Sequence, residues 1–145
     1  MGSRLNGKVA VVTGGGAPTM SGEYANGHWV QPTIWTGLPE DSPIIREEIF
    51  GPCCHIAPFD TEEEAIRIAN GTVFGLGGSV WTKDMNIAHR VSNAIRAGTV
   101  WVNCYDKSSP VTPFGGFKQS GFGRDRSPHA VDKYMDFKTI WTVYE

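Results

Sequence analysis

Three short apolar runs between residues 53 and 103 are separated by two stretches with helical periodicity, and this alternation restricts the fold more than any other feature. The first helical stretch begins at a capping box formed by Thr61 and Glu64, and the second begins at Asp84 and stops at Gly98. Strands that alternate with helices pair through right-handed crossovers. The sequence therefore predicts an α/β fold: a single layered domain with a mainly parallel sheet, flanking helices and a C-terminal edge strand. The three apolar runs cover residues 53–59, 76–82 and 99–103.

The segments on either side of this pattern divide the chain into three parts. Residues 1–16 form a predicted strand and glycine turn, consistent with a tag or fusion segment, and residues 17–136 form the main domain. Residues 137–145 contain an alternating, aromatic-rich run that predicts a terminal strand. Because an edge strand presents unpaired main-chain groups, we expect a homo-oligomer that forms through Phe137 to Tyr144.

Composition limits the partners and the compartment. A chain of 145 residues with 40% hydrophobic residues is expected to bury a substantial core within one domain. Its net charge of −2, without a basic patch, argues against nucleic acid or a membrane surface as a partner, and no apolar run approaches the ~20 residues of a membrane span. Three cysteines, two of them adjacent, do not make a disulfide framework, which favours a cytoplasmic location.

The first strand allows a second interpretation. The run 5–16 ends in Thr13 and three glycines, which resembles the start of a short-chain dehydrogenase. A phosphate-binding turn would need further glycines where this chain has Pro18 and Met20, and proline removes a main-chain donor. A short-chain dehydrogenase remnant that binds NAD through residues 13–16 stays open as an alternative.

Residues 47–52, Glu-Glu-Ile-Phe-Gly-Pro, place a carboxylate beside an aromatic ring just before a turn. A carboxylate can accept two hydrogen bonds from a diol, and a ring face can cover a flat heterocycle. The alternative interpretation is that Glu47 and Glu48 are surface charges at the start of a helical turn.

Together with a later segment, residues 47–52 resemble the two C-terminal signature segments of the aldehyde dehydrogenase superfamily. The later segment is Pro-Phe-Gly-Gly-Phe-Lys-Gln-Ser-Gly at 113–121, and the resemblance covers roughly residues 11–145. It implies that residues 17–136 are part of a catalytic domain and that residues 137–145 are an oligomerisation strand. The implied parent activity is oxidation of an aldehyde to a carboxylic acid, with NAD or NADP as the hydride acceptor.

The resemblance also implies roles for individual residues. Glu48 would hold the hydroxyls of the nicotinamide ribose, and Phe50 would pack against the nicotinamide side. The loop after the third strand would line the substrate tunnel, which places Tyr105, Ser108 and Phe114 on the tunnel wall. Many relatives carry an aromatic residue where this chain has Ser108, so the tunnel is expected to be more polar here. The alternative is that these are ordinary loop residues of a folded fragment.

Glycines and two cations in and next to the second signature segment are expected to shape this part of the chain. Gly115 and Gly116 are expected to allow close main-chain approaches where a Cβ would clash. Lys118 and Arg124 are expected to anchor the loop or to contact a neighbouring subunit.

We expect no catalytic residue and no metal site in this chain. Aldehyde oxidation requires a thiolate nucleophile and a base that activates water, and the resemblance places the nucleophile upstream, in a segment that this chain does not contain. Cys53 and Cys54 begin an apolar strand, and Cys104 has no adjacent histidine or lysine to activate it. The four histidines show no metal-ligand spacing.

These observations predict a C-terminal fragment of an NAD(P)-dependent aldehyde dehydrogenase that is inactive alone and binds no cofactor by itself. The nucleophilic cysteine, the general base and the Rossmann domain would all be missing from it. The alternative from a different class is a non-catalytic module that associates with itself through its terminal strands.

Overall fold

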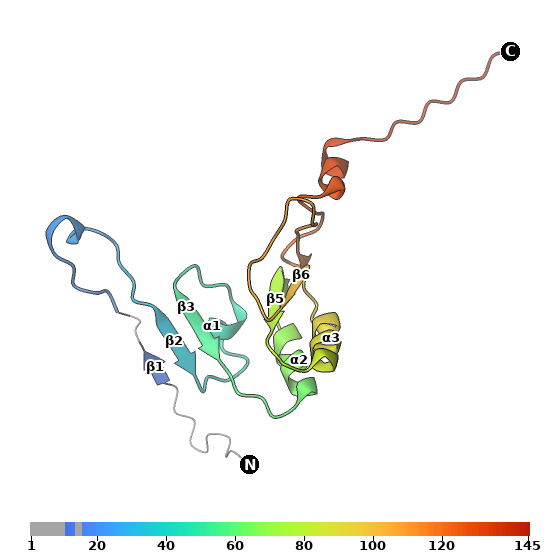
Figure 1. Ribbon diagram of the computed structural model, residues 1–145. Helices are drawn as coiled ribbons and strands as arrows, with labels where there is room; N and C mark the ends of the chain where they lie inside the picture. Colours follow the sequence, from blue (N-terminus) through green and yellow to red (C-terminus); the bar gives the residue numbers. More distant parts are fainter. Residues whose placement is uncertain (1–10, 14–15) are drawn as a thin grey trace. The chain divides into compact units, whose positions relative to one another are not determined.

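The computed structural model describes residues 11–13 and 16–145, with the main chain only for 11–13 (Figure 1). The predicted strand residues 5–10 and the glycines 14–15 lie outside the described residues. The chain divides into two compact units, one ending at Phe59 and the other beginning at Asp60, a boundary that the sequence analysis does not predict.

The first unit is built on a three-stranded mixed sheet with the order β1-β2-β3. Strand β1 is antiparallel to β2, and β2 is parallel to β3, with Thr33 opposite Cys53. A short helix begins at Pro43 and connects β2 to β3. The elements are β1 (Val11–Thr13), the 3-10 helix η1 (Gly22–Tyr24), β2 (Thr33–Thr36), α1 (Pro43–Arg46) and β3 (Cys53–Ile56).

The second unit contains a strand–helix–strand unit, β5-α3-β6, whose strands are parallel. A second strand pair, β4 with β7, is antiparallel. The α/β class, the parallel pairs and the flanking helices are as predicted. The elements are α2 (Glu62–Asn70), β4 (Phe74–Gly75), β5 (Gly77–Val80), α3 (Met85–Ala94), β6 (Thr99–Val102), β7 (Phe117–Lys118) and the 3-10 helix η2 (Pro128–Tyr134).

Both longer helices begin at the predicted caps. The hydroxyl of Thr61 accepts a hydrogen bond from the Glu64 N–H (3.1 Å), while the Glu64 carboxylate accepts one from the N–H of Asp60, one residue before the cap (2.9 Å). The carboxylate of Asp84 accepts from two N–H groups of the first turn of α3. These short-range bonds satisfy donors that a helix start leaves free.

Three details of the predicted strands are corrected. The strands were expected in one sheet, but β3 pairs with β2, and β5 pairs with β6 in a separate sheet. The predicted loop 104–123 contains β7. Residues 137–144 form no strand within the described chain, since an extended segment becomes a strand only when a partner accepts its ladder of hydrogen bonds.

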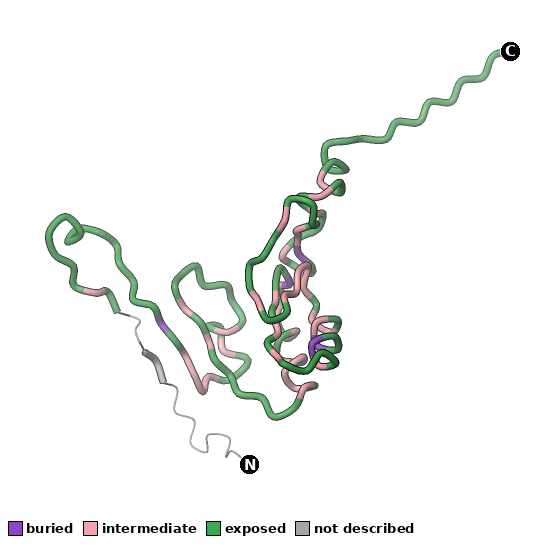
Figure 2. Tube along the Cα trace, in the orientation of Figure 1, coloured by how far each residue is buried: buried purple, intermediate pink, exposed green. Residues whose placement is uncertain are grey.

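A further correction concerns the core. Among the described residues, the buried hydrophobic side chains are Ala88 and Val91 of α3, with exposed fractions of 3% and 9%. Figure 2 shows the same result along the chain, where nearly all described residues are half-buried or exposed. The expectation of a substantial core is therefore wrong for this chain, and polar contacts must contribute much of what holds its elements together.

Helices α2 and α3 are joined by two sets of polar bonds. The guanidinium of Arg90, in the middle of α3, donates to both oxygens of Glu62, the first residue of α2, at 2.8 and 2.7 Å. At their C-terminal ends, the carboxamide of Asn70 donates to the Ala94 carbonyl (2.9 Å) and accepts from the Arg96 N–H (2.8 Å). A bidentate pair fixes geometry better than a single contact does.

The Glu62–Arg90 pair predicts an acid-dependent contribution to stability. The hydrogen bond from Arg90 lowers the pKa of Glu62, and the same bond raises the pKa of Arg90. A lowered carboxyl pKa stabilises the fold above the ordinary glutamate range, and this contribution is lost as the pH falls through the lowered value. Glu62→Gln is expected to lower the melting temperature at neutral pH, with the difference from the unsubstituted chain disappearing as the pH falls through the lowered pKa of Glu62, or in molar salt.

Glu63→Gln is the matched control, because it removes a carboxylate from the same helix turn. Melting curves followed by circular dichroism over this pH range test the pair. Equal losses for Glu62→Gln and Glu63→Gln would mean that only the charge at the helix start matters.

Candidate functional site

The segment 47–50 lies beside a small hollow that two of its four side chains line. Glu47 is extended, with φ −95° and ψ 150°. Glu47 and Ile49 line the hollow, which has a volume of ≈210 Å³ and lies beside β2 and β3. Glu48 and Phe50 do not line it, and both are exposed, Phe50 to 94%.

Local hydrogen bonds direct this segment into β3. Helix α1 begins with Pro43, whose fixed φ suits the first helical position, and the Glu47 N–H donates to the Pro43 carbonyl at 2.8 Å. The Gly51 N–H then donates to the Ile49 carbonyl (2.9 Å), and the Cys53 N–H donates to the Gly51 carbonyl (2.8 Å). Two such three-residue turns in succession bend the chain sharply just after Phe50.

The loop after β6 carries the three residues predicted for a substrate wall. Tyr105 is 70% exposed, and its ring lies 5.1 Å from that of Trp101, centroid to centroid. Ser108 is exposed. Phe114 is half-buried, and the guanidinium of Arg126 lies 5.3 Å from its ring centroid. Two main-chain hydrogen bonds with Asp125, at 2.8 and 2.6 Å, hold Phe114 in place.

The second signature segment is tied to the end of α2. The ammonium of Lys118 donates to the carbonyls of Asn70 and Thr72, both at 3.0 Å. A cation is favourable at a helix C-terminus, where carbonyls lack partners. The guanidinium of Arg124 donates to the Gly116 carbonyl at 3.0 Å and lies 5.2 Å from the ring centroid of Phe117. Lys118 and Arg124 thus anchor the loop, the first of the two roles predicted for them.

Glycines permit close main-chain packing around this segment, as predicted for Gly115 and Gly116. A Cβ at Gly115 would lie 2.5 Å from the Gly123 carbonyl oxygen, and one at Gly116 would lie 2.5 Å from the Ser120 Cβ. The tightest position is Gly98, where a Cβ would lie 1.6 Å from the Gly115 carbonyl oxygen. Gly98 was predicted only as a helix stop, but it is also the point at which the signature segment crosses the chain before β6.

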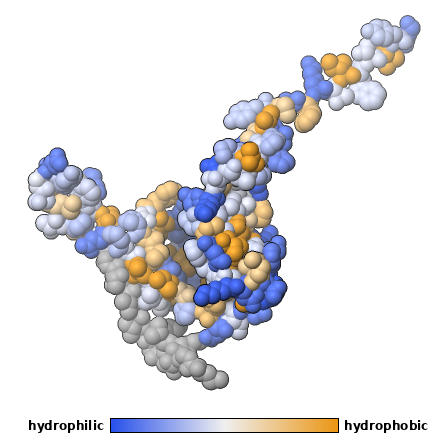
Figure 3. Space-filling model, viewed as in Figure 1, coloured by the Kyte–Doolittle hydropathy of each residue, from blue (hydrophilic) through white to orange (hydrophobic). Residues whose placement is uncertain are grey.

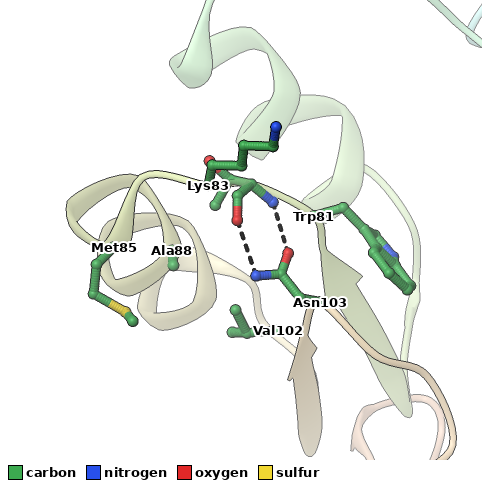
Figure 4. A pocket seen from close by; sticks show the side chains of 7 residues that line it. Trp81, Lys83, Met85, Ala88, Val102 and Asn103 are labelled. Carbon is green, nitrogen blue, oxygen red and sulfur yellow. Dashed lines mark hydrogen bonds between the residues drawn. The ribbon is translucent and has the colours of Figure 1, made fainter.

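A hollow of ≈570 Å³ lies beyond the C-terminal ends of β5 and β6 (Figure 4). Trp81, Met85 and Val102 supply much of its apolar lining. The side chain of Asn103 lies at its edge, where it is hydrogen-bonded to the main chain of Thr82. In α/β folds, crevices at the carboxyl ends of parallel strands are common places for ligands.

The five predicted site residues fall into two groups. Glu48 and Phe50 belong to the unit that ends at Phe59, and the three substrate-wall residues, Tyr105, Ser108 and Phe114, belong to the other unit. Two residues of the second unit were not singled out from the sequence. Trp101 contacts Tyr105 of the substrate-wall loop, and Asn103, at the start of that loop, bonds to Thr82. The available signal was an asparagine at the end of the third apolar run, since asparagine tolerates positive φ.

The three cysteines are free, and Cys54 is exposed while Cys53 and Cys104 are half-buried. No group of three or more histidine, cysteine or carboxylate side chains that could hold a metal ion occurs in the described ranges. None of the helices at 16–145 is both long and apolar enough to cross a membrane.

The family model described as "Aldehyde dehydrogenase family" matches residues 3–140. The chain therefore belongs to the aldehyde dehydrogenase family, as its two signature segments predicted. The match includes the first strand, for which a short-chain dehydrogenase start had also been considered.

Curated relatives and solved structures agree with this assignment. The chain is 55% identical over 132 residues to a 2-hydroxymuconic semialdehyde dehydrogenase of Pseudomonas putida, covering 91% of this chain and 27% of the relative. It is 47% identical to a betaine aldehyde dehydrogenase of Rhizobium etli, covering 92% and 27%. An indole-3-acetaldehyde dehydrogenase of P. syringae, solved with NAD+ and IAA, is similar with a TM-score of 0.82 and 48% identity, covering 92% of this chain and 26% of that one.

An aldehyde dehydrogenase of Bacillus cereus, solved with NAD+, has a TM-score of 0.82 and 40% identity, covering 94% of this chain and 27% of that one. The chain thus spans about a quarter of the length of the relatives that it matches.

Proposed function

We propose that this chain supplies part of the cofactor site and part of the substrate wall of an NAD-dependent aldehyde dehydrogenase. The observation that carries the proposal is the family match over residues 3–140, together with the exposure of Glu48 and Phe50 outside the hollow that Glu47 and Ile49 line. Two solved relatives hold NAD+, which favours NAD over NADP.

Glu48 and Phe50 fit the nicotinamide end of a dinucleotide. Both side chains are exposed, and neither lines the hollow beside β2 and β3. The Glu48 carboxylate would accept hydrogen bonds from the two ribose hydroxyls, and the ring of Phe50 would cover one side of the nicotinamide. When bound, the dinucleotide would accept the hydride of the aldehyde.

Tyr105, Ser108 and Phe114 would form part of the wall that receives the aldehyde. Exposed hydroxyl groups at Tyr105 and Ser108 favour a polar substrate. This agrees with the name of the relative from Pseudomonas putida, which specifies 2-hydroxymuconic semialdehyde. We therefore propose a polar semialdehyde as the substrate class of the parent enzyme.

We expect the 145-residue chain to be inactive without the rest of such an enzyme, because the resemblance places the nucleophile and the base in other segments. The purified chain, mixed with NAD+ and 2-hydroxymuconic semialdehyde or betaine aldehyde, is expected to form NADH at the background rate in an absorbance assay. Titration calorimetry is expected to detect no heat of NAD+ binding.

Cys104→Ala is the informative variant for the activity assay. Turnover above background that disappears in Cys104→Ala would show that this chain carries its own nucleophile, and it would overturn the proposal of inactivity. NAD+ binding that Glu48→Gln weakens would instead show that the cofactor contacts work without the rest of the enzyme.

A second function is favoured by the exposed C-terminal residues. The aromatic and aliphatic side chains of the segment 137–144 are 74–95% exposed, and Figure 3 shows isolated orange patches among paler and blue atoms toward the C-terminus. We propose that this segment pairs with a second copy of the chain or with another subunit of the enzyme, because an unpaired, apolar extended segment acts as a template for strand addition.

A further inference from the structure

The segment that follows β6 is held by a side chain of β6 itself. The indole of Trp101 contacts the segment at two points, four and six residues further along the chain. Its ring lies 5.1 Å from the ring of Tyr105 with an interplanar angle of 54°, and its Nε1–H donates to the Lys107 carbonyl at 2.7 Å. A hydrogen bond to the main chain on one side of the turn and a ring contact on the other restrict the path of residues 105–107.

Asn103 fixes the base of the same segment. Its carboxamide oxygen accepts from the Thr82 N–H, and its amide nitrogen donates to the Thr82 carbonyl, both at 2.9 Å (Figure 4). Its own N–H donates to the Val80 carbonyl at 2.9 Å. The side chain therefore takes the place of the strand partner that Thr82 would otherwise need.

The main chain explains why a side chain is required there. Asn103 has a φ of 52°, which turns the chain out of β6 immediately after Val102. Once the main chain has left the sheet, it can no longer pair with Thr82, and the carboxamide completes the ladder instead. Asparagine is one of the few residues that both tolerate a positive φ and offer a donor and an acceptor.

We propose that Trp101 and Asn103 are positioning residues that preset the loop 104–108, so that Tyr105 and Ser108 are presented in one arrangement before any substrate arrives. The relevance to substrate rests on the proposed function, whereas the loop geometry does not. A preset wall loop lowers the cost of ordering on binding. All of the contacts involved lie within the unit 60–145, so the loop is ordered without the other segments of the enzyme.

Limited proteolysis of the full chain tests the loop directly. At dilutions where sedimentation shows a monomer, trypsin cuts after Lys107, inside the loop, and after Lys138 in the exposed C-terminal segment, which serves as the internal reference. When cleavage needs local opening, its rate follows the population of the open form. In the unsubstituted chain, cleavage after Lys107 is expected to be at least about fivefold slower than after Lys138, since the opening breaks hydrogen bonds and a ring contact.

Three variants separate the contacts. Trp101→Phe keeps a ring beside Tyr105 but removes the Nε1–H donor, and it is expected to speed cleavage after Lys107 about fivefold. Asn103→Gly keeps a residue suited to the positive φ but removes both side-chain bonds, and it is expected to have an equal or larger effect. Trp141→Phe, in the C-terminal segment, is the control and is expected to leave the Lys107 rate unchanged.

A spectroscopic measurement provides an independent readout. The indole N–H resonance of Trp101 is expected to exchange with solvent more slowly than that of Trp141, which is 90% exposed, and Asn103→Gly is expected to speed the exchange of the Thr82 amide. Circular dichroism identifies a variant that has unfolded. If Asn103→Gly is unfolded, the proteolysis rate of Trp101→Phe alone tests the proposal. Cleavage after Lys107 as fast as after Lys138, or unchanged in a folded Trp101→Phe, would overturn the proposal.

These measurements use neither aldehyde nor dinucleotide. A mobile loop would therefore contradict the positioning role without contradicting the proposed function. An unexpected result in the NADH assay would contradict the proposed function without affecting the conclusion about the loop.

Discussion

Replacing Gly98 with alanine is expected to lower the free energy of unfolding of the unit 60–145 by about 3 kcal/mol, the upper range for overpacking. The added methyl would lie 1.6 Å from the Gly115 carbonyl oxygen and 2.7 Å from its carbonyl carbon, so the main chain of the signature segment would have to move. Such a shift would also strain two hydrogen bonds that anchor the segment, from Lys118 to the Asn70 carbonyl and from Arg124 to the Gly116 carbonyl. Urea unfolding followed by circular dichroism measures the loss.

Gly51→Ala is the matched control for this substitution. A Cβ at Gly51 would have only the Ile49 side chain as a neighbour, at 3.9 Å, so it is expected to change stability by less than about 1 kcal/mol. If Gly98→Ala unfolds at the same urea concentration as Gly51→Ala, the signature segment does not cross the chain at Gly98 as closely as described.

The second large effect is expected in the state of association. Sedimentation velocity of the chain at micromolar concentrations is expected to show self-association, and removal of residues 137–145 is expected to leave a monomer. Trp141, which is 90% exposed, would bury much of its surface on strand pairing. Burying a large apolar side chain contributes about 1.5–3 kcal/mol, so Trp141→Lys is expected to weaken association at least about tenfold.

Thr142→Lys introduces the same charge one residue further along and is expected to have a smaller effect. A chain that sediments as a monomer at all concentrations would rule out pairing with a second copy. Equal weakening by Trp141→Lys and Thr142→Lys would point to charge repulsion in place of apolar burial.

Signals that act over a few residues predicted their elements well. The helix starts at Thr61 and Asp84 were found because their side chains bond to N–H groups two or three residues away, and those bonds form in the structure. The partner of β3 was not found, because the choice between β2 and β5 depends on pairing that no local pattern encodes. The prediction of a substantial core was wrong, because the rule that relates chain length to burial assumes a chain that covers its own apolar side chains.

The same distinction holds for the candidate sites. Glu48 and Phe50 could be singled out because they belong to a compact motif, and their assignment to a cofactor remains a prediction. Asn103 could not be found in this way, since its carboxamide bonds to Thr82, 21 residues earlier in the chain. Lys118 was expected to anchor the loop, but its partners could not be named, because the Thr72 and Asn70 carbonyls lie 46 and 48 residues away in the chain.

The scarcity of buried apolar side chains, with only Ala88 and Val91 below the surface among the described residues, also affects how this chain should melt. The heat capacity of unfolding comes mainly from apolar surface that becomes hydrated, and ordinary domains gain about 12–15 cal/mol/K per residue. A chain that already exposes most of this surface gains much less. Its enthalpy of unfolding should therefore vary little with temperature, its stability curve should be broad and shallow, and cooling should weaken it less than it weakens a domain with a large core.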